Sequence, residues 1–271
     1  MFYYRSAACT VTGRRGNNQD NYLIVDAFNP LEHDDASHAH CGKAADRPLF
    51  AVADGMGGES SGEKASFIAV EQLARYRELY SQIKVGGEMQ MISKLAINAN
   101  RLLCDTMAHN GTSRMGSTLV ALSLGAKTAY VTNLGDSPAY LLRGNTLKKL
   151  TRDHTEGQVM LDAGVFTQEQ FAKHPSRNRL TQHLGITPDE MELSLPNYAP
   201  MPLKTGDIFL LCSDGLCGVV PEQKLTGLLK SDISVQDKAA KLIQTAIDAK
   251  SSDNITALVV EISKKRSKHK I

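Results

Sequence analysis

The chain has 271 residues, of which 42% are hydrophobic and 22% charged, values close to those of an average globular protein. This length fits one large domain or two small ones, and 21 glycines with 9 prolines are too few for a collagen-like or low-complexity chain. No apolar run approaches the ~18 residues of a membrane-spanning helix, and the N-terminus lacks the basic-then-apolar order of a signal peptide. We therefore predict a soluble cytoplasmic protein without a membrane span.

The formal charge of +2 conceals an uneven distribution. Five of the 31 lysines and arginines lie between Lys264 and Lys270, where there is no acidic residue, so the rest of the chain is mildly acidic. A basic end can touch nucleic acid, anionic lipid or an acidic partner, but most chain ends are simply solvated, and we predict a solvated tail over residues 264–271. The five cysteines are odd in number and dispersed, which indicates reduced thiols.

The first half of the chain combines short strands with two amphipathic helices. Two β-like runs within Val11–Ala27 flank the polar turn 13–18, and a third run, Leu49–Ala53, ends on an aspartate and glycines. Apolar residues at helical spacing predict helices from Gly62 to about Tyr80 and from Met89 to about Met107.

The second half returns to strands, then helices, then a last strand. Turn residues at 125–127 and 144–145 predict an antiparallel meander of strands 117–124, 128–133, 139–143 and 147–150. After the polar segment 156–178, with one or two short helical stretches, we predict strands 191–198, 208–212 and 255–262 and helices 221–230 and 235–250. Helices and strands are segregated, so an α+β layered domain is favoured over a doubly wound one.

Four aspartates share one context, at the end or the start of a predicted strand beside a glycine or another turn-forming residue: Asp54, Asp136, Asp214 and Asp253. Any one of them alone could simply form a turn. Strand ends of packed sheets can converge, however, and carboxylate oxygens are preferred ligands of Mg²⁺ and Mn²⁺. Such an all-oxygen cluster is the expected host for two metal ions that hydrolyse phosphate esters.

Eight motifs carry a family resemblance. In chain order they are Arg15-Gly-Asn-Asn-Gln-Asp20, Asp54-Gly-Met-Gly-Gly58, Gly116-Ser-Thr118, Asn133-Leu-Gly-Asp-Ser137, Asp153-His-Thr155, Leu180-Thr-Gln-His-Leu-Gly185, Cys212-Ser-Asp-Gly-Leu216 and Asp253-Asn-Ile-Thr256. They resemble the motifs of the metal-dependent protein phosphatases, the PPM or type 2C serine/threonine family, and especially its compact bacterial members. The resemblance spans roughly residues 6–262.

The resemblance implies a four-layer α-β-β-α sandwich of two antiparallel sheets flanked by helices, with residues 1–263 as the catalytic domain and 156–178 as its flap. It implies Mn²⁺ or Mg²⁺ as cofactor, with two core ions and a third, weaker one. The ligands that it implies are Asp54 bridging the core ions, the Gly55 carbonyl, Asp214 with Asp253, and Asp136 with Asp214 at the third ion.

The implied reaction is hydrolysis of phosphoserine or phosphothreonine by a water that bridges the two ions. Arg15 matches the arginine that grips the phosphate, and Asp20 matches a group that orients water. Two positions depart from the family pattern. Gln19 replaces a common glutamate, and Met56 stands where eukaryotic members often have a histidine proposed as general acid, which methionine cannot replace. The implied partners are a phosphorylated protein substrate and a cognate Ser/Thr kinase, and a monomer is expected.

Other interpretations stay open from the sequence. In 28–47, His33, His38, His40 and Cys41 suggest zinc, but their spacing matches no standard signature, and an enlarged exposed hairpin loop is favoured. His154 could be an acid or base, or could fix the start of the flap by hydrogen bonds. A catalytically silent phosphoprotein-binding module would have lost metal ligands, whereas the four aspartates and Arg15 are all present. A nucleic-acid-binding protein would show basic and aromatic patterning in its body, which this sequence lacks.

Overall fold

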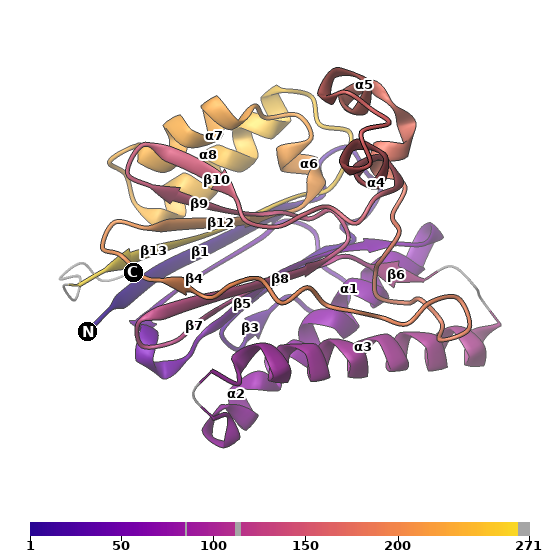
Figure 1. The fold of residues 1–271 in the computed structure, drawn as a ribbon, viewed down its shortest axis with the longest axis horizontal. Coiled ribbons are helices and arrows are strands. Elements are labelled where there is room, and N and C mark those ends of the chain that lie inside the picture. The colour runs from indigo at the N-terminus through magenta and orange to yellow at the C-terminus, as the bar shows by residue number, and fades with distance from the viewer. Residues whose placement is uncertain (85, 112–114, 265–271) are drawn as a thin grey trace.

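The computed structural model describes residues 1–84, 86–111 and 115–264, which form two sheets between two layers of helices (Figure 1). One sheet has six strands in the order β10 (Thr146–Lys149), β9 (Ala139–Arg143), β12 (Ile208–Cys212), β13 (Ile255–Ser263), β1 (Tyr3–Val11) and β4 (Ala36–Lys43). The other runs β11 (Met201–Pro202), β8 (Thr128–Leu134), β7 (Leu119–Leu124), β5 (Leu49–Met56), β2 (Asp20–Ile24) and β3 (Ala27–Phe28), with β6 (Gly116–Ser117) paired to β5. All the strand pairs are antiparallel. The predicted α+β sandwich is therefore confirmed.

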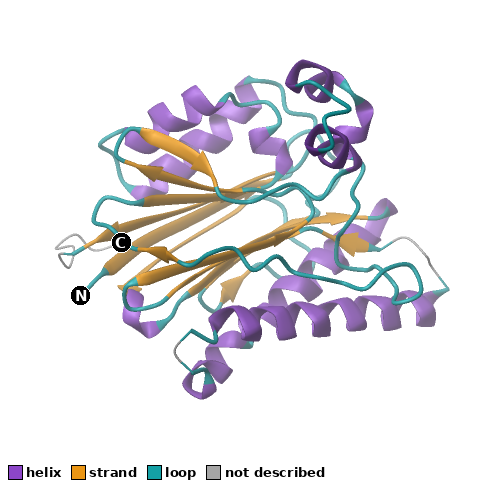
Figure 2. Ribbon diagram, in the orientation of Figure 1, coloured by secondary structure: helices purple, strands orange, loops and turns teal. Residues whose placement is uncertain are grey.

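Helices cover the outer faces of both sheets (Figure 2). The seven-stranded sheet is covered by α1 (Gly58–Ala74) and α3 (Glu88–Asn110), joined through α2 (Tyr76–Leu79) and the 3-10 turn Tyr80–Gln82. The six-stranded sheet is covered by α7 (Glu222–Lys230) and α8 (Val235–Asp248), which follow the short α6 (Asp214–Cys217). The flap contains α4 (Glu156–Asp162), α5 (Gln168–Lys173) and the 3-10 turn Pro175–Asn178, and a further 3-10 turn spans Ala44–Asp46.

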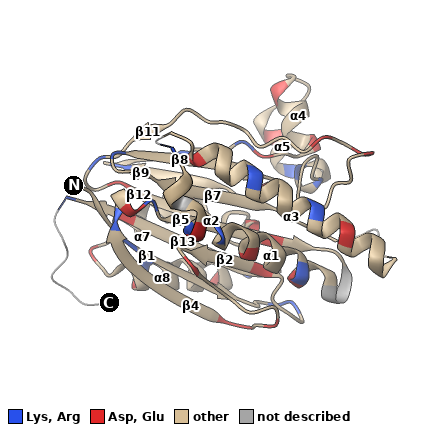
Figure 3. Ribbon diagram, turned by 90° about the horizontal axis from the view of Figure 1, so that it is seen from below, with Lys and Arg blue, Asp and Glu red and all other residues tan. Residues whose placement is uncertain are grey.

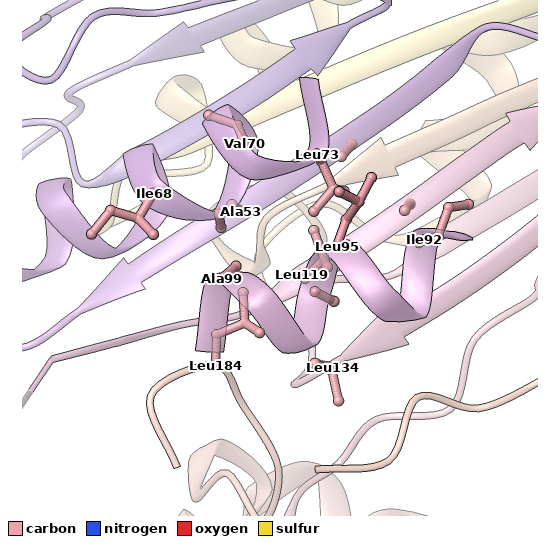
Figure 4. Packing of buried hydrophobic residues seen from close by; sticks show 14 of the residues in the cluster. Ala53, Ile68, Val70, Leu73, Ile92, Leu95, Ala99, Leu119, Leu134 and Leu184 are labelled. Carbon is pink, nitrogen blue, oxygen red and sulfur yellow. The ribbon is translucent and has the colours of Figure 1, made fainter. Parts of the chain in front are cut away.

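Apolar side chains at helical spacing hold α3 against the sheet. Ile92, Leu95 and Ala99 share one face of α3 and are buried in the same cluster as Ala53 and Leu119 of the sheet (Figure 4). Charges of both signs are distributed along α3, as Figure 3 shows. Because Leu95 is 2% exposed, truncation to alanine should cost about 2–5 kcal/mol of unfolding free energy. The helix layer thus fixes the sheet whose strand ends build the site.

The predicted meander is only half right. The hairpins β7–β8 and β9–β10 are confirmed, but β8 belongs to the seven-stranded sheet and β9 to the six-stranded sheet. The chain changes sheets at Gly135–Pro138, where Asp136 lies. Hydrophobic alternation within each strand is the same in either sheet, so it does not reveal such a crossing.

Three further predictions are corrected. The first strand begins at Tyr3, well before the run expected from Val11, and pairs with β13 and β4 on its two sides. Residues 36–43 form the edge strand β4, so the loop expected over 28–47 is wrong there. Residues 191–198 form no strand; Leu193 and Leu195 are partly buried and pack against the apolar cluster that includes α3.

Candidate active site

The ends of strands from both sheets meet at one cleft of about 500 Å³. From the seven-stranded sheet, Asp54 lies near the end of β5 opposite Asp20 of β2, and Asp136 follows β8. From the six-stranded sheet, Asp214 follows β12 and Asp253 precedes β13. The cleft is lined by Arg15, Gly55 and the aspartates 54, 136, 214 and 253, so the structure brings these predicted site residues together.

Asp20 lies beneath the cleft in a network of hydroxyl groups. Its Oδ2 accepts hydrogen bonds from Ser213 Oγ and Thr256 Oγ1, both at 2.7 Å. Thr256 Oγ1 is in turn 2.6 Å from Thr10 Oγ1. Burial raises the pKa of Asp20 to about 7, since only 1% of the residue is exposed. Its Oδ1 is buried and has no hydrogen-bond partner within the described residues. A buried carboxylate oxygen without a protein partner points to a bound water or ion beside it.

The carboxylates that line the cleft destabilise each other's charge. Burial raises the pKa of Asp54 well above its ordinary value, and Asp20 and Asp214 raise it further. Burial and the neighbouring Asp214 raise the pKa of Asp136 to about 7, and burial with Asp253 raises that of Asp214. Cations bound beside these carboxylates would offset this cost and favour their ionised form.

Arg15 brings a positive charge to the cleft, and it pairs with one of the aspartates. Its Nε and Nη2 donate to the two carboxylate oxygens of Asp253 at 2.9 and 2.8 Å. This two-pronged ion pair raises the pKa of Arg15. Two residues assigned to different partners by the family resemblance, phosphate and metal, therefore bind each other in this structure, and nothing in the spacing of residues 15 and 253 could have predicted that.

Asn254 fixes the loop that carries Arg15. Its Nδ2 donates to the carbonyl oxygens of Thr12 and Asn17 at 2.9 and 2.8 Å, and its Oδ1 accepts from the Gln19 N–H at 2.9 Å. The Asn254 side chain is thus hydrogen-bonded to backbone groups that precede and follow Arg15 in the chain. The sequence places Asn254 in the motif Asp253-Asn-Ile-Thr256 but does not indicate a role for it.

Glycines let backbone segments approach closely around Asp54. A Cβ on Gly55 would collide with the Gly62 carbonyl and would lie 2.6 Å from the Gln19 carbonyl. Gly135, which precedes Asp136, has a φ of 89°, and a Cβ there would lie 2.7 Å from Thr118 Cγ2. The role of Gly62, on α1, was missed because a glycine within a helix gives no sign of what it faces.

The flap begins beside the cleft and is bonded to it. His154 Nδ1 accepts from the Gly135 N–H at 3.3 Å, and its backbone carbonyl accepts from the Thr181 N–H at 2.8 Å. These bonds favour the role in fixing the flap for His154. The cleft is also lined by Asn178, Leu180 and His183, for which the sequence indicated no individual role.

The histidines of the 28–47 segment have separate protein partners. His33 Nε2 lies 2.8 Å from the Asp20 carbonyl oxygen, and His38 Nδ1 lies 2.6 Å from Tyr22 Oη. His40 Nδ1 lies 2.9 Å from Tyr4 Oη and the two rings stack. These contacts give the imidazoles structural roles around β4, and the structure offers no support for the zinc interpretation.

The donor set of the cleft fits hard divalent cations. Across residues 1–84, 86–111 and 115–264, no group of three His, Cys, Asp or Glu side chains is arranged to hold a metal ion by itself. Mg²⁺ is usually bound through one or two carboxylates, with water completing its shell. Paired aspartates, a backbone carbonyl and the unpartnered Oδ1 of Asp20 suit that mode of binding.

Comparison with known proteins identifies the family. A model of protein phosphatase 2C matches residues 29–256. The serine/threonine phosphatase stp of Listeria welshimeri is 34% identical over 217 residues, which cover 79% of this chain and 84% of that protein. Protein phosphatase PhpP of Streptococcus pneumoniae is 33% identical over 228 residues, 83% of this chain and 89% of its own.

A solved structure agrees with the sequence comparisons. The catalytic domain of the serine/threonine protein phosphatase PstP, in complex with 2 manganese ions, superposes with a TM-score of 0.77 at 26% identity, covering 97% of this chain and 100% of that one. The chain belongs to the protein phosphatase 2C family and is a metal-dependent serine/threonine phosphoprotein phosphatase. Its cofactor is Mn²⁺ or Mg²⁺.

The described residues contain no helix that is both long and apolar enough to cross a membrane.

Proposed function

We propose that the aspartate cleft is the catalytic centre, in which this chain hydrolyses phosphoserine and phosphothreonine in proteins. Asp54 and the Gly55 carbonyl hold the core Mn²⁺ or Mg²⁺ ions together with Asp214 and Asp253, and Asp136 with Asp214 holds a third, weaker ion. The observation that carries this assignment is the convergence of four aspartates, from strand ends of both sheets, on one cleft beside Arg15. When bound, the ions neutralise phosphate charge and make water acidic enough to act near neutral pH.

Arg15 binds the phosphate of the substrate. Its fork on Asp253 uses one N–H of Nε and one of Nη2, and a guanidinium has five N–H groups, so three still can donate to phosphoryl oxygens. Asp253 thereby orients Arg15 and itself lines the cleft. A planar donor pair suits phosphate better than the point charge of a lysine.

Asp20 orients the attacking water from below the cleft. Ser213 and Thr256 both donate to Oδ2, so the carboxyl group cannot rotate without losing two buried hydrogen bonds. This leaves Oδ1 available to accept a hydrogen bond from water. Met56 also lines the cleft and has no proton to give, so the leaving alkoxide takes its proton from solvent.

Domain organisation and partners follow from the same assignment. Residues 1–263 are the catalytic domain with the flap at 156–178, and the basic residues 264–271 are a tail, of which all but Lys264 lie outside the described residues. We infer a cytoplasmic monomer whose substrates are phosphorylated proteins and which opposes a Ser/Thr kinase. Phosphoproteomes compared with and without the gene would identify those substrates.

Removal of metal tests the proposal. Phosphatase activity on a phosphothreonine peptide and on p-nitrophenyl phosphate should disappear in EDTA and return with Mn²⁺. Asp54→Asn should lose nearly all activity and keep the circular dichroism spectrum of the wild type, whereas Asp136→Asn should retain a reduced rate. Wild-type turnover by Asp54→Asn, or full activity after exhaustive metal removal, would refute the assignment of the centre.

A further inference from the structure

A second hollow of about 450 Å³ lies directly beside the catalytic cleft. Met56, Gly57 and His183 line both, so one continuous surface leads from the aspartates into this hollow. We call it the side groove. A peptide whose phosphoryl group lies in the cleft therefore has this groove within reach of the residues next to the phosphorylated one.

The walls of the side groove are mainly apolar. Met115 and Ile186 are 4% and 7% exposed, while Met191 stands 43% exposed at its edge. Methionine is flexible and polarisable, so such walls can adapt to apolar side chains of different shape. The catalytic cleft, by contrast, is lined by charged residues.

The floor of the groove is fixed in place. Ser117 and Leu184 exchange two backbone hydrogen bonds, of 3.0 and 2.8 Å, which join the segment after the flap to β6. Asn100 of α3 accepts from the Gly185 N–H at 2.7 Å and donates to the Ile186 carbonyl at 2.9 Å. A hollow with such a fixed floor is already formed before ligand arrives, so little ordering cost accompanies binding.

One carboxylate stands among the described lining residues of the groove, that of Glu190. Its Oε2 accepts from both the N–H and the hydroxyl of Thr187, each at 3.0 Å, so the side chain is held in one orientation although it is exposed. An anchored carboxylate beside an apolar hollow attracts a cationic group that lies just beyond an apolar one.

We propose that the side groove is a substrate-specificity site, which takes an apolar side chain within two residues of the phosphoserine or phosphothreonine, and that Glu190 favours a basic residue beyond it. This inference rests on the proposed function, because it places the phosphorylated residue in the aspartate cleft. Two observations support a protein substrate as the occupant: the groove continues from the cleft, and an acidic side chain accompanies an otherwise apolar wall.

The test compares phosphothreonine peptides that differ only near the phosphorylated residue. Each of the two positions on either side is leucine or serine in turn, and kcat/KM is measured with Mn²⁺. At one position leucine should be preferred by about tenfold, the lower end of the range for a single methylene group in an apolar pocket. Met191→Ser should reduce this preference to about twofold. Ile97→Ser is the control: Ile97 lies on α3, away from the side groove, and is 52% exposed, so this variant should keep the preference.

Charge is tested in the same series. With leucine at the preferred position, arginine one residue further out should raise kcat/KM about two- to threefold over glutamine at low salt, and Glu190→Gln should remove that gain. Equal kcat/KM for leucine and serine at all four positions, or a preference that survives in Met191→Ser, would overturn the groove assignment. If the wild type hydrolyses neither the peptides nor p-nitrophenyl phosphate, the proposed function fails, and not the groove assignment alone.

Discussion

Removing the Asn254 side chain should both destabilise the protein and displace Arg15. Asn254 is 5% exposed and makes three side-chain hydrogen bonds to the backbone of residues 12–19. Each backbone group left without a partner costs about 1–3 kcal/mol, and because the Arg15 loop borders solvent the lower figure applies. Asn254→Ala should therefore lower the free energy of unfolding by about 3 kcal/mol, measured by urea denaturation of the metal-free protein.

The same substitution separates two roles of the loop. If Asn254 positions Arg15, kcat/KM should fall about ten- to a hundredfold in Asn254→Ala under conditions where the variant is fully folded, since small misplacements of a binding group are costly. Asn145→Ala is the matched control, because Asn145 is exposed and its side chain bonds only Lys230 among the described residues; it should change neither quantity by more than about twofold or 1 kcal/mol. An unchanged urea midpoint in Asn254→Ala would refute the energetic argument, and an unchanged kcat/KM would refute the positioning role.

Three further predictions concern the cleft. The pKa of Asp20 is raised to about 7 in the fold. Without metal, the contribution of Asp20 to stability is therefore complete below pH ~4 and is lost as pH rises through 7. The gain in Tm on adding Mn²⁺ in place of EDTA should be larger at pH 8 than at pH 5.5, and the reverse order would contradict this sign. Arg15→Lys should recover only part of the kcat/KM lost in Arg15→Ala, and full recovery would show that the forked geometry is irrelevant. Met56→His should accelerate a phosphothreonine peptide more than p-nitrophenyl phosphate, whose phenolate leaves unaided, and equal changes would show that this position does not control protonation of the leaving group.

Local features were predictable wherever one segment determines its own structure. The hairpin turns at 125–127 and 144–145 form where glycine permits the reversal, and the periodicity of 235–250 matches α8, with Leu242 and Ile243 buried. Each of these signals depends on neighbours within a few residues. The eight motifs likewise identified the aspartates of the site, because recognising a motif requires only that its residues occur in the right order along the chain.

Features that depend on distant partners could not be predicted. The polar composition of 36–43 suggested a loop, yet β4 is stabilised by pairing with β1 and by bonds from His38 and His40 to tyrosines of the core. The pair formed by Arg15 and Asp253 joins residues 238 positions apart, and no local pattern encodes it. The sequence therefore indicates which residues build the cleft but not how they are bonded to one another.

The arrangement of the cleft couples cation binding to the packing of the two sheets. Asp54 and Asp136 belong to strand ends of the seven-stranded sheet, and Asp214 and Asp253 to those of the six-stranded sheet. Burial, together with the charges of neighbouring aspartates, raises the pKa values of Asp54, Asp136 and Asp214 at this end. The hydroxyl network of Asp20, which bonds Ser213 and Thr256 across the sheets, and the bond from the Gln19 N–H to Asn254 hold the two sheets together near the carboxylates without a cation. Because the apolar core between the sheets lies elsewhere, these few bonds can keep the carboxylates within one cleft while leaving their oxygens free for ligands, which a tightly packed apolar junction could not do.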